Sequence, residues 1–197
     1  GEFEKPKYFS YNDKLCAHGR NGKVGCSACI DVCSTGAISS LFKNGQGTVE
    51  VNPNLCMGCG ACSTVCPSGA MRYNYPSVSH QGKELKTIAS VFNAEIKKLN
   101  LDIAPSLLLH NFKAGTQLID SLGRSAHVLP KQFEGLPAFV VPYGIEHIAS
   151  TGLDLWLSAL SYGFAEVLLL LSGDEDPAYR DALMNQVKLA NSILHAY

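Results

Sequence analysis

The sequence lacks several features that would assign it to a common class of protein. Its formal net charge is only −1 over 197 residues, so the charge balance does not favour binding to nucleic acid. The longest apolar run, Val167 to Leu171, is far too short to cross a membrane. No Gly-x-Gly-x-x-Gly turn follows an expected strand and no Walker-type loop occurs, which leaves a dinucleotide or nucleoside triphosphate site without support.

Cysteine is missing from most of the chain. All eight cysteines lie between residues 16 and 66, and residues 67–197 contain none. This asymmetry predicts a cysteine-containing domain over 4–75, a polar linker with Pro and Gly over 76–83, and a cysteine-free domain over 84–197. Because the chain begins Gly1-Glu2-Phe3 rather than with Met, we expect it to be a piece of a longer protein.

The cysteines fall into two related runs. The second run, Cys56 to Pro67, has the spacing C-x2-C-x2-C-x3-C-P. The first run, Cys26 to Cys33, aligns with Cys59 to Cys66 at an offset of 33 residues, together with the Val before the last cysteine and a Gly-Ala pair after it. The two runs therefore indicate an internal duplication.

The duplication also accounts for the first cysteine. Cys16 follows Asn-Asp-Lys-Leu, and Cys56 follows Asn-Pro-Asn-Leu, so Cys16 takes the place of Cys56 in the first copy. Extra residues separate Cys16 from Cys26, and Ser34 stands where the second copy has Pro67. All eight cysteines are then used and none is left over.

This pattern resembles the bacterial ferredoxins that hold two 4Fe–4S clusters. The resemblance covers about residues 4–75 and implies an α+β ferredoxin-like cluster domain with a role in one-electron transfer. It also implies crossed ligation, in which the last cysteine of each run binds the cluster of the other run. The implied ligands are Cys16, Cys26, Cys29 and Cys66 for one cluster, and Cys56, Cys59, Cys62 and Cys33 for the other.

Two alternative uses of the cysteines fit less well. Zinc sites usually take two separated C-x2-C pairs, often with His, whereas each run here offers closely spaced thiolates. A disulfide framework is typical of small secreted chains, and a chain of 197 residues with 46% hydrophobic composition does not need one. Thiolates that hold clusters must stay reduced, so we expect a cytoplasmic location.

Local patterns predict the remaining elements. In the cysteine domain, a strand at 8–11 is expected to pair with 71–75, and Asn44-Gly45 predicts a hairpin turn. The cysteine-free domain alternates helices and strands, which predicts a small α/β domain with a three-stranded parallel sheet. Its expected elements are a helix at 84–99, a strand at 106–110, a helix at 115–122 ended by Gly123, a strand at 138–142, a helix at 151–162, a strand at 167–171, and a last helix opened by Asp176-Pro177.

The ends of these strands are where a ligand would bind in a parallel sheet. His110 and His147 follow two of the strands and could face one site, although plain hydrogen-bonding roles are the simpler interpretation. The order of elements resembles the delta subunit of methyl-viologen-reducing hydrogenases, an α/β iron–sulfur electron adapter. That family has cysteines at its strand ends and residues 67–197 have none, so the resemblance implies a docking role here.

The sequence as a whole predicts an electron-transfer module of a larger redox protein or complex. Its expected partners are a redox donor and acceptor, including other domains of the same full-length chain. No nucleophile or acid–base pair stands out, which favours a component of an oxidoreductase over an enzyme by itself. Two alternatives remain open: an iron–sulfur subunit whose α/β domain binds a flavin or small substrate, and a cluster-based redox sensor.

Overall fold

The chain folds into two compact units, each described here by itself. The computed structural model describes residues 5–19, 24–43 and 45–196, so Asn44 of the expected hairpin turn lies outside the described residues. We call the first unit the cysteine unit; it comprises residues 1–78, 149–153 and 176–197. The second, the sheet unit, comprises residues 79–148 and 154–175. The domain boundaries expected from the sequence stay a prediction.

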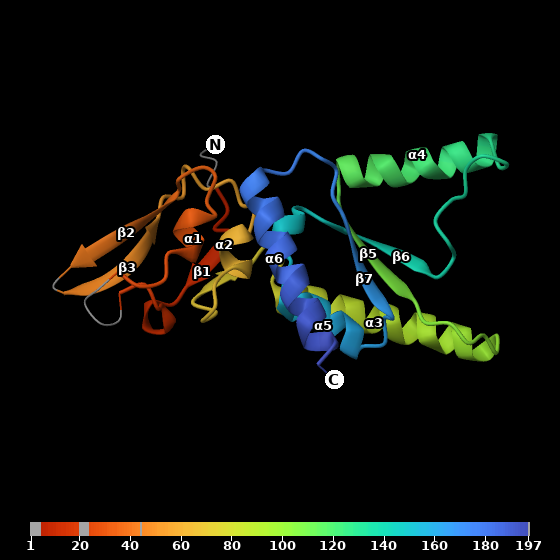
Figure 1. Cartoon of the computed structure of the whole chain (residues 1–197), viewed down its shortest axis with the longest axis horizontal. Helices are drawn as coiled ribbons and strands as arrows, with labels where there is room; N and C mark the ends of the chain where they lie inside the picture. Colours follow the sequence, from red (N-terminus) through yellow and green to blue (C-terminus); the bar gives the residue numbers. More distant parts are fainter. Residues whose placement is uncertain (1–4, 20–23, 44, 197) are drawn as a thin grey trace. The chain divides into compact units, whose positions relative to one another are not determined.

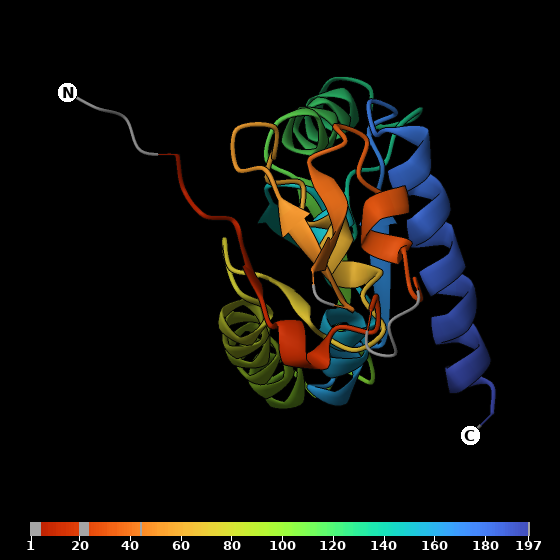
Figure 2. The same ribbon diagram turned by 90° about the vertical axis from the view of Figure 1, so that its left-hand side faces the viewer.

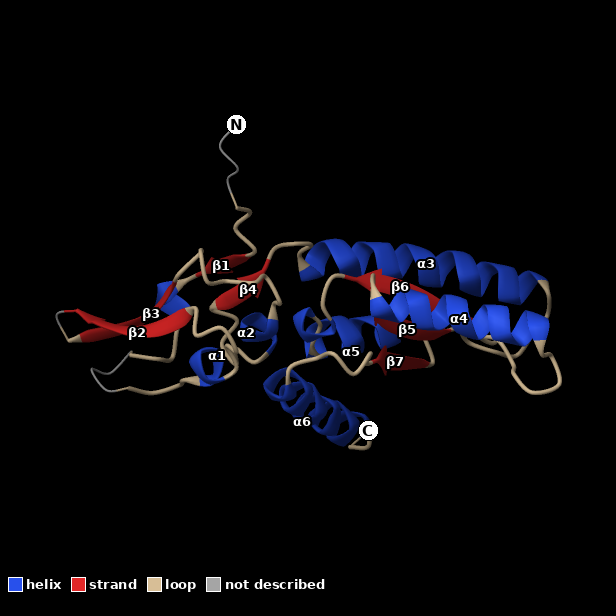
Figure 3. Cartoon of the chain, turned by 90° about the horizontal axis from the view of Figure 1, so that it is seen from above, coloured by secondary structure: helices blue, strands red, loops and turns tan. Residues whose placement is uncertain are grey.

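Short strands and short helices form the first part of the cysteine unit. Strand β1 pairs antiparallel with β4, and β2 pairs antiparallel with β3, as the sequence predicts (Figure 3). Helices α1 and α2 begin at equivalent positions of the two cysteine runs, which is consistent with the duplication. The elements are β1 (Phe9–Tyr11), η1 (Asp13–Leu15), α1 (Ala28–Asp31), β2 (Ile38–Lys43), β3 (Gln46–Val51), α2 (Ala61–Thr64) and β4 (Met71–Tyr73).

Two later segments complete the cysteine unit, namely residues 149–153 and helix α6 (Pro177–Leu194). The Asp176 side chain accepts a hydrogen bond of 2.8 Å from the Ala178 N–H, so Asp176 caps the helix that Pro177 opens, as expected. Helix α6 runs beside α1 (Figure 2). The Thr64 hydroxyl donates to the Ala149 carbonyl at 3.2 Å, which ties residues 149–153 to α2.

The cysteine side chains are part of the core of this unit. Ile38, Val49 and Met71 are at most 5% exposed and form one cluster, against which Cys29, Cys33, Cys62 and Cys66 pack. Both cysteine runs therefore point into one apolar interior. Partial burial of this kind limits the access of water to these thiols.

The sheet unit contains the three-stranded parallel sheet that the sequence predicts, in the order β6-β5-β7. The central strand is the most buried, since Leu107 and Leu109 are both 0% exposed. Helix α4 covers one face of the sheet, and α3 and α5 cover the other (Figure 1). The elements are α3 (Val78–Lys98), β5 (Ser106–Asn111), α4 (Ala114–Val128), β6 (Val140–Ile145), α5 (Leu153–Ser161) and β7 (Glu166–Leu170). The short helix η2 (Ile148–Ser150) has most of its residues in the segment 149–153 of the cysteine unit. None of the helices in the described ranges is both long and apolar enough to span a membrane.

Two helices differ from the sequence-based expectation because glycine lies inside them. Helix α3 begins at Val78 and so takes up most of the segment expected as a linker, including Gly82. A Cβ added at Gly82 would lie 3.5 Å from the Tyr162 hydroxyl, so the backbone of α3 lies close to this side chain. Helix α4 continues past Gly123 to Val128, although Gly123 was expected to end it. Glycine in a helix interior costs about 1 kcal/mol relative to Ala, which the rest of the helix outweighs.

Substitution of Gly123 distinguishes a helix interior from a helix end. A Cβ at this position would have no heavy atom within 4 Å, so Gly123→Ala is expected to stabilise the sheet unit by about 0.5–1 kcal/mol. The matched control is Gly163→Ala, where φ is +106° and a Cβ would lie 2.8 Å from the Asn93 amide nitrogen, so it is expected to destabilise. Urea unfolding of the full chain measures the free energy of unfolding of both variants. A lower free energy for Gly123→Ala would contradict the placement of Gly123 inside α4.

Candidate metal centre

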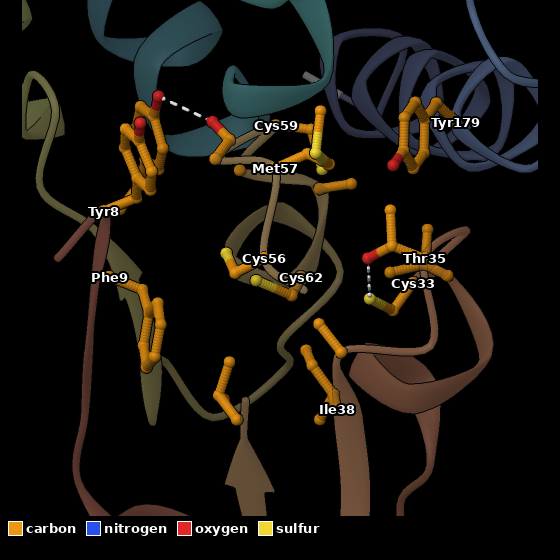
Figure 4. Close-up of a pocket in the computed structure, with 17 residues that line it drawn as sticks. Tyr8, Phe9, Cys33, Thr35, Ile38, Cys56, Met57, Cys59, Cys62 and Tyr179 are labelled. Carbon is orange, nitrogen blue, oxygen red and sulfur yellow. Dashed lines mark hydrogen bonds between the residues drawn. The ribbon is translucent and has the colours of Figure 1, made fainter. Parts of the chain in front are cut away.

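A cavity in the cysteine unit is lined by cysteines of both runs. It contains about 460 Å³ of space, counting its opening to solvent. Cys56, Cys59 and Cys62 come from the second run, and Cys33 comes from the first (Figure 4). Most of the remaining lining is apolar or aromatic and includes Phe9, Val32, Ile38 and Tyr179. The cavity thus gathers three cysteines of one copy and the last cysteine of the other.

Among the other four cysteines, Cys29 interacts electrostatically with the remaining three. Burial raises the pKa of the Cys29 thiol to about 11, and the charges of Cys16, Cys66 and Cys26 raise it in the same direction. These three side chains therefore lie close enough to Cys29 to interact with it electrostatically. They are two cysteines of the first copy and the last cysteine of the second copy.

Cys62 lies where the two sets of cysteines meet. Burial raises the pKa of its thiol to about 12, and the charges of Cys59, Cys29, Cys56 and Cys33 add to this shift. All of these neighbours except Cys29 line the same cavity as Cys62. A thiol of this kind stays protonated near neutral pH until a metal displaces the proton.

The sulfur of the last cysteine in each run lies near the hydroxyl group of the residue two positions later. The Cys66 sulfur lies 3.7 Å from the Ser68 hydroxyl, and the Cys33 sulfur lies 3.6 Å from the Thr35 hydroxyl. Burial alone would raise the pKa of Cys66, but hydrogen bonds from the Met71 N–H at 3.4 Å and from Ser68 hold it below its usual value. These groups stabilise the thiolate form, which is the form that binds metal.

Glycines shape the loop between the cysteines of the second run. Gly58 has φ +74° and Gly60 has φ +76°, and both lie in the left-handed region that favours glycine. A Cβ at Gly60 would lie 2.5 Å from the Ser150 Cβ, so a side chain there is excluded by contact as well as by backbone conformation. The Tyr73 hydroxyl donates to the Gly58 carbonyl at 2.9 Å and fixes the loop from the other side.

Two tyrosines that sequence reasoning did not single out lie near the cysteines. The Tyr11 hydroxyl hydrogen-bonds to the Thr48 hydroxyl at 2.7 Å and lies near Cys16. The Tyr179 hydroxyl hydrogen-bonds to the Ser34 hydroxyl at 2.5 Å and lies near Cys59. Burial raises the pKa of both tyrosines, so both hydroxyls keep their protons at neutral pH. Tyr11 lies near the first run in sequence, but no local signal marks Tyr179.

A buried histidine holds the start of the first run in place. His18 is 1% exposed, and its ring nitrogens lie 2.8 Å from the Cys26 carbonyl oxygen and 2.7 Å from the Ser40 hydroxyl. Both ring nitrogens are therefore engaged in hydrogen bonds that connect the segment before Cys26 to strand β2. His18 positions the chain around Cys26.

The strand ends of the sheet unit carry a separate hydrogen-bond network. The Asn111 side chain donates to the Ser172 hydroxyl at 3.1 Å and accepts from the Gly115 N–H at 2.9 Å. His110 is 7% exposed, and its Nδ1 lies 3.1 Å from the Asn111 carbonyl oxygen. These bonds connect the ends of β5 and β7. A ligand role for His110 and His147 stays a prediction.

The donor set suits an iron–sulfur cluster. All eight cysteines are free, and thiolates are the ligands that such clusters prefer. Among the described residues, no three His, Cys, Asp or Glu side chains are grouped closely enough to hold a single metal ion. A cubane takes one thiolate on each of its irons, so its ligands stand further apart than those of a single ion.

Comparison with known proteins adds a match in this part of the chain. Residues 24–70 match the family model described as the 4Fe-4S dicluster domain. The match contains seven of the cysteines and begins after Cys16. This segment is thus supported as a 4Fe–4S ferredoxin-type domain. No curated protein and no solved structure matches the chain.

The pKa shifts predict an order of thiol reactivity in the cluster-free chain. Because the pKa of Cys66 is lowered and that of Cys62 is raised to about 12, iodoacetamide near pH 7.5 is expected to modify Cys66 at least about tenfold faster than Cys62. The rate at Cys66 should level off at lower pH than the rate at Cys29. Peptide mass spectrometry over time measures each site, and equal rates at Cys62 and Cys66 would contradict the shifts.

Proposed function

We propose that the chain is an electron-transfer module that binds two 4Fe–4S clusters in its cysteine unit. Cys16, Cys26, Cys29 and Cys66 hold one cluster, and Cys56, Cys59, Cys62 and Cys33 hold the other. When bound, each cluster supplies one-electron oxidation and reduction. The chain's own residues supply the thiolates, exclude water with an apolar lining, and direct hydroxyl and N–H groups at the sulfurs.

The observation that carries this proposal is the composition of the cavity. Cys33 belongs to the first run, yet it lines the cavity together with Cys56, Cys59 and Cys62. The charges acting on Cys29 come from Cys16, Cys26 and Cys66, which are the complementary set. Both observations support the crossed use of Cys33 and Cys66.

The loops that carry the cysteines are accessible to a partner. Met57 is 66% exposed and lines the cavity beside Cys56. Leu55 and Leu15 precede Cys56 and Cys16, and they are 49% and 42% exposed. Apolar side chains at these positions support docking of a redox protein close to either set of cysteines. Each set of cysteines then has its own exposed surface where an electron donor or acceptor can dock.

The sheet unit serves, in this proposal, to dock the module onto a larger redox partner, including further domains of the same full-length chain. Exposed apolar side chains on and after α4 support this role. Leu118 and Val128 are 47% and 70% exposed, and Leu129 and Phe133, which follow the helix, are 45% and 43% exposed. Exposed apolar side chains are common at interaction surfaces.

Single substitutions of Cys33 and Cys66 test the crossed arrangement. We expect the anaerobically reconstituted chain to hold about eight iron and eight sulfide ions, and its cysteines to resist alkylation. Cys33→Ser is expected to leave Cys56, Cys59 and Cys62 open to alkylation while the cysteines of the other set stay protected. These cysteines lose their protection because a cluster deprived of one thiolate is held less tightly and dissociates. Peptide mass spectrometry after alkylation reads each cysteine separately.

The matched control is Cys66→Ser, which should expose the complementary set, Cys16, Cys26 and Cys29. Electron paramagnetic resonance (EPR) of the reduced chain then records one remaining cluster in each variant. If Cys33→Ser instead exposes Cys16, Cys26 and Cys29, each run holds its own cluster and the crossed arrangement is wrong. Bound zinc in place of iron and sulfide would overturn the function itself.

A further inference from the structure

Helix α6 reaches the cavity from a part of the chain far from the cysteine runs. Tyr179 lines the cavity together with Cys33 and Cys59, and its hydroxyl points toward it (Figure 4). Tyr179 and Ala182, one turn apart on α6, pack against the cluster formed by Val32, Ala61 and Ala149. Cys59 and Cys62 pack against the same cluster. One face of α6 is therefore part of the wall around these cysteines.

The hydrogen bonds of Tyr179 can be assigned a direction. Its hydroxyl hydrogen-bonds to the Ser34 hydroxyl at 2.5 Å, and Cys59 lines the same cavity nearby. A cysteine that binds iron is a thiolate and has no proton to give, so in a hydrogen bond between the two Tyr179 must be the donor. A phenol has only one proton, so Tyr179 must then accept from Ser34. The order of donation is then Ser34 to Tyr179 to Cys59.

This arrangement gives a reason for the departure of the first run from the second. Ser34 stands at the position that Pro67 occupies in the second copy, and the Ser34 hydroxyl is the group that hydrogen-bonds to Tyr179. Proline has neither a hydroxyl nor an N–H to offer. The two copies therefore differ at the position where α6 makes this hydrogen bond.

We infer that Tyr179 of α6 is a positioning residue for the cluster at Cys33, Cys56, Cys59 and Cys62: it donates a hydrogen bond to the Cys59 sulfur, and Ser34 orients it. The inference rests on the proposed function, because it takes Cys59 to be a cluster ligand. A hydrogen bond to a ligand sulfur favours the reduced cluster, whose negative charge is greater, and so raises its reduction potential. Helix α6 thus sets the potential of one cluster and leaves the other to different residues.

Tyr11 provides an internal comparison from the other set of cysteines. Its hydroxyl lies near Cys16 and hydrogen-bonds to the Thr48 hydroxyl, as the Tyr179 hydroxyl does to Ser34. Tyr11 lies on β1, inside the duplicated segment, whereas Tyr179 lies outside it. Removing either hydroxyl should therefore affect a different cluster.

Redox titration of the reconstituted full chain, followed by EPR, tests the inference. Tyr179→Phe keeps the ring and removes the hydroxyl, so it should lower the potential of one cluster and leave the other unchanged. A tenfold change in the reduction equilibrium corresponds to 59 mV for one electron, and we expect a shift of up to about this size. Ser34→Ala should move the same cluster in the same direction by less, because it removes the group that orients Tyr179.

Two further variants and one direct measurement complete the test. Tyr11→Phe should move the other cluster, and Tyr75→Phe, a change at a 52% exposed tyrosine that packs edge-on against Tyr8, should move neither. After exchange into deuterated water, pulsed EPR of the reduced chain should lose one exchangeable deuteron in Tyr179→Phe. This measurement needs only that the variant binds its clusters. If Tyr179→Phe does not bind them, the shift in potential of Ser34→Ala tests the inference instead.

Unchanged potentials together with an unchanged deuteron signal in Tyr179→Phe would overturn the inference and reduce Tyr179 to a packing residue. A shift of both clusters by the same amount would also overturn it, because a local hydrogen bond acts on one cluster. Failure of the proposed function is a distinct result: the unaltered chain would then show no 4Fe–4S signal at all.

Discussion

The burial of thiols from both cysteine runs in one apolar interior is the constraint on which the cysteine unit depends. Cys29, Cys33, Cys62 and Cys66 pack against the same three apolar residues, so neither copy of the duplicated segment has a core of its own. Burial raises the cost of a free thiolate, as the pKa of about 12 at Cys62 indicates. Bound iron removes that cost, so binding of the cofactor and folding of this unit favour one another.

The two copies share their hydrogen bonds to sulfur, and they differ in what surrounds them. Thr35 and Ser68 occupy equivalent positions, and each places a hydroxyl near the last cysteine of its run. Gly36 and Gly69 also correspond, with φ of +62° and +64°. Within the duplicated segment the copies differ at Ser34 and Pro67, and outside it helix α6 packs beside Cys59 and Cys62. Two sites of common origin thus have unequal surroundings.

The sequence predicts what depends on local pattern and misses what depends on tertiary contact. The duplicated cysteine runs predict the pairing of β1 with β4, and the alternation of helices and strands predicts the parallel sheet. Glycine is common beside or between helices, so Gly82 and Gly123 are natural places to expect a linker and a helix end. Both lie inside helices, namely α3 and α4. The packing of Tyr179 beside Cys59 brings together residues that no local pattern relates, because the sequence groups the last helix with the sheet.

The position of helix α6 late in the chain has a consequence during synthesis. The ribosome produces roughly 110 residues between Cys66 and Tyr179, which takes roughly 6–20 s at about 5–20 residues per second. Throughout this interval all the cysteines have been made, while the wall of the cavity contributed by α6 does not yet exist. A cluster inserted during this interval would enter a cavity that is still open on the side of α6. Completion of α6 then encloses whatever has been inserted.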